Sequence, residues 1–163
     1  MDPGKQVRSG PADDGISLRN EIDGDLIVIV AIRDNHSVGR LTGLFDDGHR
    51  ALLQDVKVEE AAKIKRGLLD CILGRTRTQS FRRRGVGSRL LTEFLAICQR
   101  RAVREVVGSV VQHDLDATPT LMEWYARHGF KKRVPSESPL PERYRPPNTV
   151  WEVVWNPCTS NPS

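Results

Sequence analysis

A cationic, glycine-containing turn opens an amphipathic helix between Phe81 and Leu91, and this stretch constrains the fold more than any other. Its pattern is Arg82-x-x-Gly85-x-Gly87. Glycine lacks Cβ, so backbone N–H groups can approach an anion closely, and a helix directs its first N–H groups and positive dipole end toward it. Apolar residues follow at helical spacing: Val86, Leu90, Leu91, Phe94, Leu95, Cys98 and Ala102. We predict an anion-binding loop before a buried helix; the alternative is an ordinary helix start.

The chain before this loop has the pattern of a β-meander. Alternating and β-branched runs are separated by Asp-Gly and Asp-Asn turns, which predicts about four antiparallel strands. Their expected ranges are 16–19, 26–32, 37–45 and 51–58.

Helices and strands alternate in the rest of the chain, so we expect an α+β (α/β) fold with one domain over 16–156. Further helices are expected over 59–73 and from Pro119 to Gly129, and further strands over 105–111 and 150–155. Residues 1–15 are expected to be a disordered arm, 131–148 an extended loop and 157–163 a tail.

Composition narrows the partners. There are 25 Lys and Arg against 21 Asp and Glu, which favours anionic ligands without indicating nucleic acid. The 3 cysteines have no metal-ligand spacing, so we expect reduced thiols and no metal. The longest apolar stretch, 26–32, is too short to span a bilayer, so we expect a cytoplasmic protein without a membrane partner.

Two motifs in this order give a family resemblance. The loop from Arg82 to Ser88 and the run from Tyr125 through Gly129 to Phe130 resemble the GNAT superfamily of acyl-CoA-dependent N-acyltransferases, over roughly 26–155. The resemblance implies a mixed, mostly antiparallel sheet of about six to seven strands flanked by three helices. It also implies an N-acetyltransferase that uses acetyl-CoA and acetylates a primary amine, of a small molecule or a protein, by direct attack in a ternary complex.

The resemblance assigns coenzyme A to the loop and to the end of the fourth strand. A pyrophosphate fits the cationic, N–H-rich turn, and the amides of the pantetheine arm can pair with strand backbone. The implied cofactor-binding residues are Val56, Val58, Arg83, Arg84, Gly85, Val86, Gly87 and Ser88.

Tyr125 is the implied proton donor to the departing thiolate, and its alternative role is a core aromatic. The general base is less defined, because Leu52 stands where many relatives place a glutamate. His113 is our candidate, since imidazole exchanges protons near neutral pH, and a surface histidine is its alternative. Asp55 is nearby, although strand alternation can turn it away, and water with Tyr125 alone remains an alternative.

The segment 59–80 is an insertion relative to the family, and its helix would either line the acceptor side or only pack on the core. Another class of function is a non-catalytic, GNAT-like module that binds acyl-CoA. A nucleic-acid-binding protein is disfavoured, because aromatic residues do not interleave with the arginines. An oligomer is compatible with the sequence.

Overall fold

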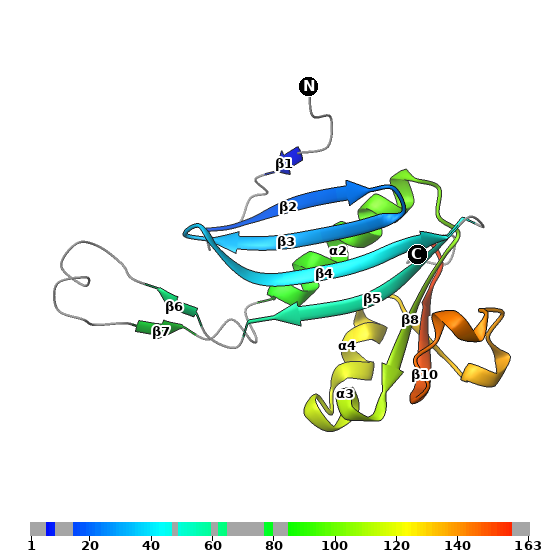
Figure 1. Cartoon of the computed structure of the whole chain (residues 1–163). Coiled ribbons are helices and arrows are strands. Elements are labelled where there is room, and N and C mark those ends of the chain that lie inside the picture. Colours follow the sequence, from blue (N-terminus) through cyan, green and yellow to red (C-terminus); the bar gives the residue numbers. More distant parts are fainter. Residues whose placement is uncertain are drawn as a thin grey trace. The chain divides into compact units, whose positions relative to one another are not determined.

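Figure 1 shows the computed structural model of the chain, which describes residues 6–8, 15–46, 49–59, 62–64, 77–79 and 85–157. The chain divides into two compact units that interleave in sequence. Unit 1 comprises Met1–Thr42 and Asp55–Phe94, and unit 2 comprises Gly43–Gln54 and Leu95–Ser163. Strands β4 and β5 and helix α2 run through both units. That residues 16–156 form a single domain, as the sequence suggests, stays a prediction.

One hydrogen-bonded sheet has the strand order β1-β2-β3-β4-β5-β8-β10-β9. The strands are β1 (Gln6–Arg8), β2 (Ile16–Asp23), β3 (Leu26–Arg33), β4 (His36–Asp46), β5 (Arg50–Val58), β8 (Glu105–Val111), β9 (Lys131–Arg133) and β10 (Thr149–Trp155). β1 with β2, β2 with β3, and β10 with β8 and β9 pair antiparallel, whereas β5 and β8 are parallel. The expected mixed, mostly antiparallel sheet is confirmed.

Unit 1 is built on the predicted meander. Gly24, with φ 57°, turns β2 into β3, and Asp34 and Asn35, with φ 47° and 62°, form the next tight turn. Helix α2 (Val86–Arg100) contributes Leu90 and Phe94 to the core, and both are fully buried. The apolar period thus predicted this helix correctly.

Unit 2 is built on β8 and β10, which pair from Val106–Trp155 to Val111–Thr149. Helices α3 (Gln112–Ala117) and α4 (Leu121–Arg127) follow β8, and Gly129, with φ 83°, ends the α4 turn as predicted. Two 3₁₀ turns, η1 (Pro135–Glu137) and η2 (Glu142–Tyr144), precede β10. None of the helices among the described residues is both long and apolar enough to cross a bilayer.

The helix expected over 59–73 is wrong where the structure describes this segment. Strand β6 (Ala62–Ile64) pairs antiparallel with β7 (Arg77–Gln79), and Lys63 lies opposite Thr78. A helical apolar period is local, whereas strand pairing is set by residues far along the chain, so pairing overrides it here. The remainder of the expected helix, apart from Glu59, lies outside the described residues.

Three other expectations differ in detail. Residues Gln6–Arg8, expected in a disordered arm, add to the edge of β2, whose backbone groups are available for pairing. The expected loop over 131–148 contains β9, η1 and η2. Helix α3 was not expected, and α4 begins at Leu121 with Thr120 as its N-cap rather than at Pro119.

Candidate functional site

The expected anion-binding turn is described from Gly85 onward. Gly85 is exposed, has φ 73°, and would have no atom within 4 Å of an added Cβ. Its carbonyl accepts a hydrogen bond from the Arg89 N–H at 2.9 Å. The amides of residues 86–88 precede this bond in the first turn of α2. Val86, 1% exposed, anchors this end of α2 in the core.

Gly39 on β4 joins the start of α2 to the end of β5. A Cβ added at Gly39 would lie 2.9 Å from Val86 Cγ1, 3.1 Å from Leu90 Cδ1 and 3.2 Å from the Lys57 carbonyl oxygen. Val56 and Val58, which flank Lys57, are half-buried. Unit 1 thus brings two separately predicted parts of the cofactor site, the helix start and the strand end, against one point on β4.

Sequence reasoning missed Gly39, although a signal was present. Glycine within a strand pattern often marks a close approach by another backbone or element. Gly87 and Ser88 are half-buried in the first turn of α2. Arg83 and Arg84, also predicted to bind the cofactor, lie outside the described residues, so that role stays a prediction.

Tyr125 lies half-buried on α4 in unit 2, inside a small aromatic group. Its ring contacts Trp124 and Phe130 edge-to-face, with centroids 4.9 and 5.4 Å apart. The Phe130 N–H donates to the Tyr125 carbonyl at 3.1 Å. These contacts fix the tyrosine at the end of the α4 turn, and Trp124 and Phe130 act in packing as expected. Its catalytic role stays a prediction.

His113 is exposed on α3, the helix before α4 in the same unit. The β5 position at which many relatives place a glutamate holds Leu52. Leu52 is 5% exposed and packs with Val107 and Leu140. Asp55, farther along β5, forms an ion pair with Lys57 Nζ at 3.0 Å. Asp55 and His113 are both exposed, and the role of His113 as the base stays a prediction.

β5 and β8 pair over only part of their lengths within unit 2. The parallel register runs from Arg50–Glu105 to Leu53–Gly108, while β5 continues to Val58 and β8 to Val111. Partial pairing leaves backbone groups on later strand residues that the other strand does not use. This is the kind of edge that a peptide-like arm can join.

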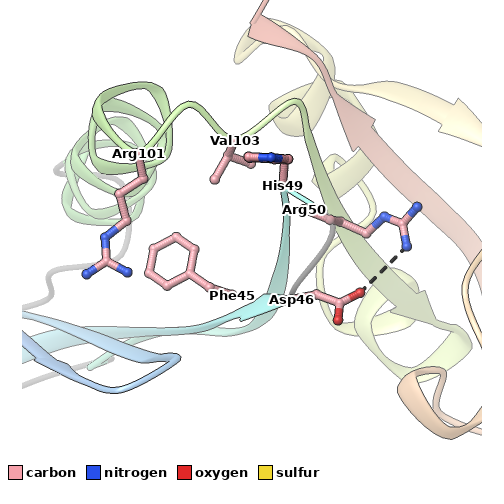
Figure 2. Close-up of a pocket in the computed structure, with 6 residues that line it drawn as sticks. All are labelled: Phe45, Asp46, His49, Arg50, Arg101 and Val103. Atoms are coloured by element: carbon pink, nitrogen blue, oxygen red, sulfur yellow. Dashed lines mark ion pairs between the residues drawn. The ribbon is translucent and has the colours of Figure 1, made fainter.

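Figure 2 shows a hollow in unit 2 that sequence analysis did not predict. Its volume is about 170 Å³, and it is lined by Phe45, Asp46, His49, Arg50, Arg101 and Val103. The Arg101 guanidinium lies 4.4 Å from the Phe45 ring centroid, and Arg50 pairs with Asp46 at 3.7 Å. Cofactor pockets typically measure about 300–1,000 Å³. The hollow is too small for coenzyme A and contains none of the predicted site residues.

Neither a metal centre nor a cysteine nucleophile emerges from the described part of the chain. No group of three His, Cys, Asp or Glu side chains there has the arrangement of a metal site. Cys98 is buried on α2, and burial raises the pKa of its thiol to about 12, although nearby Arg101 opposes the shift. A thiol with this pKa remains protonated near neutral pH and is a poor nucleophile.

The fold has clear neighbours among solved structures. A GNAT-family acetyltransferase from Staphylococcus aureus Mu50 aligns with a TM-score of 0.59 at 15% identity, over 80% of this chain and 68% of that one. A GNAT-family acetyltransferase from Elizabethkingia anophelis, solved with acetyl-CoA bound, aligns with a TM-score of 0.59 at 12% identity, over 88% of this chain and 99% of that one.

A third neighbour is the PaiA N-acetyltransferase from Thermoplasma acidophilum, solved in complex with coenzyme A. It aligns with a TM-score of 0.52 at 13% identity, over 81% of this chain and 61% of that one. The sequence itself matches no protein-family model and no curated protein sequence. The likeness at these identities is one of fold: the chain has the fold of the GNAT-family acetyltransferases.

Proposed function

We propose that the chain is an acetyl-CoA-dependent N-acetyltransferase that transfers an acetyl group to a primary amine by direct attack in a ternary complex. The observation that carries this proposal is the start of α2. There an exposed glycine with positive φ precedes the helix amides, and Gly39 holds that turn against the end of β5. Two neighbours with this fold were solved with coenzyme A or acetyl-CoA.

The proposed cofactor site uses both parts of that arrangement. The amides of Val86, Gly87 and Ser88 and the dipole of a 15-residue helix favour the diphosphate of coenzyme A. Arg83 and Arg84 would add charge-assisted contacts. The pantetheine amides would pair with backbone groups of Val56 and Val58, beyond the four residues of β5 that pair with β8.

The chemical step requires a proton to leave the amine and another to reach the departing sulfur. We assign the second transfer to the Tyr125 hydroxyl, whose ring is held by Trp124 and Phe130. His113 is the proposed base, acting directly or through water. The amine nitrogen attacks the thioester carbonyl, the C–S bond breaks, and coenzyme A leaves as the thiol.

Binding of the cofactor is tested by calorimetric titration of coenzyme A. We expect saturable binding to the wild-type chain and weaker binding to the Gly85→Val variant, because a β-branched side chain disfavours φ 73° and hinders backbone approach to the phosphates. Equal affinity for both proteins would contradict the assignment of the diphosphate to this turn.

Catalysis is tested by coenzyme A thiol release across a panel of amines. We expect Tyr125→Phe to lower kcat by about a hundredfold to ten-thousandfold with little change in coenzyme A affinity, because only the proton donor is removed. Tyr144→Phe is the matched control, since it removes a tyrosine hydroxyl that Arg143 contacts outside the proposed site. Full kcat in Tyr125→Phe would show that another group protonates the sulfur.

A second candidate is a binding module without turnover, and the buried, apolar Leu52 favours it. This module would bind coenzyme A in the titration but release no thiol with any amine. Introducing a carboxylate by Leu52→Glu is uninformative here, because the side chain would be buried among Leu140 and Val107. Turnover by the wild-type chain therefore decides between the two functions.

A further inference from the structure

The two faces of β3 are both apolar, but only one is covered by a described helix. Ile27, Ile29 and Ala31 are fully buried on one face. Asn20, the cross-strand partner of Ile29, donates from its side chain to Glu93 of α2 at 2.9 Å, so α2 covers this face. Figure 1 shows α2 running along the strands on this side.

The opposite face of β3 carries Leu26, Val28, Val30 and Ile32. Leu26 is 39% exposed, and the other three are partly exposed. Within the described part of unit 1, α2 is the only helix. Strands that are apolar on both faces are typical of sheets covered on both sides, whereas a face in water ordinarily carries polar residues. This pattern indicates that the second face is also covered.

β2 lines this apolar strip with charged residues whose sign changes along the strand. The register places Arg19 beside Val30 and Glu21 beside Val28. Both charged residues are exposed. The face therefore has one positive and one negative position next to two equivalent valines, at neighbouring steps of the same ladder.

This arrangement is complementary to itself. In a symmetric dimer, a residue i that contacts j has its counterpart j contacting i. A two-fold axis across the strands, midway between the Arg19–Val30 and Glu21–Val28 pairs, sets Arg19 opposite Glu21 of the partner subunit. The same axis sets Val28 opposite the partner's Val30. Packed sheets lie about 10 Å apart, a distance that an arginine and a glutamate side chain can bridge together.

We propose that the face formed by Leu26, Val28, Val30 and Ile32 of β3 and Arg19 and Glu21 of β2 binds a second copy of this chain as a symmetric dimer. The valines would form a dry centre, and the two equivalent Arg–Glu contacts would fix the register. The charge reversal favours a second copy over an unlike partner, because one strand supplies both halves of each ion pair.

Light scattering on the eluting protein measures the assembly. We expect the wild-type chain to have twice the mass of the 18.3 kDa monomer at micromolar concentration. Val30→Asp should raise the dimer dissociation constant at least about tenfold, because it places a charge in the apolar centre. Glu123→Lys, on exposed α4, is a charge-changing control that should remain dimeric.

Two charge variants test the register without altering the apolar strip. Arg19→Glu and Glu21→Arg should each be monomeric, since each sets like charges against one another. An equimolar mixture of the two variants should regain the dimeric mass, because every contact then joins opposite charges. The double variant, with both substitutions on one chain, should also be dimeric.

Several outcomes would overturn the proposal. One is a wild-type chain that stays monomeric, and another is a mixture of the two charge variants that does not associate. A monomeric chain whose unfolding free energy falls in Val30→Asp would show that its own residues cover the face. A dimer that all these substitutions leave intact would place the interface elsewhere.

Discussion

A fully buried carboxylate, that of Glu152 on β10, is the residue whose position most needs explaining. Arg133 donates to it at 2.9 Å, and Arg145 forms an ion pair 3.3 Å away without hydrogen-bond alignment. Arg133 also donates to Glu105 at 3.0 Å. A buried charge is tolerated when it is paired, so these contacts tie β8, β9, β10 and the segment after η2 together.

Removing this charge should therefore destabilise the fold strongly. We expect Glu152→Gln to lower the free energy of unfolding in urea by about 3 kcal/mol, because Arg145 and Arg133 lose their shared buried counter-charge and Arg133 keeps only its bond to Glu105. Lys57→Ala is the control, since its ion pair with Asp55 is exposed and such pairs contribute under about 1 kcal/mol. Similar losses in the two variants would contradict the distinction.

Cys98 should be a poorly reactive thiol in the folded chain. Burial raises its pKa from 9.0 to about 12, so few folded molecules hold the thiolate at pH 8. In a Cys71→Ser/Cys158→Ser background, we expect maleimide to label the native chain at least about a hundredfold more slowly than the urea-unfolded chain. Equal labelling rates would show that Cys98 is accessible.

The raised pKa of the Cys98 thiol also makes the free energy of unfolding depend on pH. A thiol whose pKa is higher in the folded state contributes stability below its unfolded pKa, and this contribution is lost as pH rises from about 9 to about 12. Cys98→Ala should abolish this alkaline component of unfolding, whatever its effect at neutral pH. A pH profile identical to that of wild type over this range would exclude the ionisation.

At the scale of elements, the sequence patterns correctly predicted the helices, strands and turns that depend on neighbouring residues. The period of α2, the alternation of the meander and the turn at Gly24 lie in contiguous sequence, and each element formed where expected. β9 was missed because its pairing with β10 is non-local, as is the Arg133–Glu152 contact that holds it. The helix expected over 59–73 was wrong at Ala62–Ile64 for the same reason.

The candidate site shows the same difference between local motifs and long-range contacts. The glycine turn, the strand end and Tyr125 could be named from motifs, because a family resemblance carries them. Their support could not, since the packing of Val86 against Gly39 joins residues that are distant in the chain. Leu52 was identified from sequence as a departure from the family, but only the structure shows it in an apolar cluster with Leu140.

The contact between β4 and α2 makes a prediction about cofactor affinity. Gly39→Ala places a Cβ 2.9 Å from Val86 Cγ1 and 3.2 Å from the Lys57 carbonyl oxygen, so the Val86 side chain at the start of α2 must move. We expect a loss of about 1–3 kcal/mol in stability and at least about a tenfold rise in the coenzyme A Kd, measured by titration calorimetry.

Gly24→Ala separates these two effects. It strains a turn residue with φ 57°, where an added Cβ would meet nothing within 4 Å. It should therefore lower stability while the folded protein binds coenzyme A as wild type does. Equal Kd values for Gly39→Ala and wild type would show that the turn does not depend on this contact.

For the molecule as a whole, the proposed cofactor residues and the proposed catalytic residues belong to different units. Val56, Val58 and the turn at Gly85 are in unit 1, and His113 and Tyr125 are in unit 2. Three continuous elements, β4, β5 and α2, run through both. Breaking such an element in one unit removes backbone hydrogen bonds from the other, which favours a single cooperative unfolding transition.

The tryptophans allow this coupling to be measured, because all 3 lie in unit 2, at positions 124, 151 and 155. We expect their fluorescence and the far-UV circular dichroism of the whole chain to give coincident urea curves. Coenzyme A at one hundred times its Kd should raise the free energy of unfolding from both curves by about 2.7 kcal/mol, although its phosphate site is proposed in unit 1. Gly39→Ala, also in unit 1, should move the fluorescence midpoint without any ligand. If Gly39→Ala moves the midpoint of the dichroism curve but not that of the fluorescence curve, the units unfold separately. The continuous elements then do not couple them.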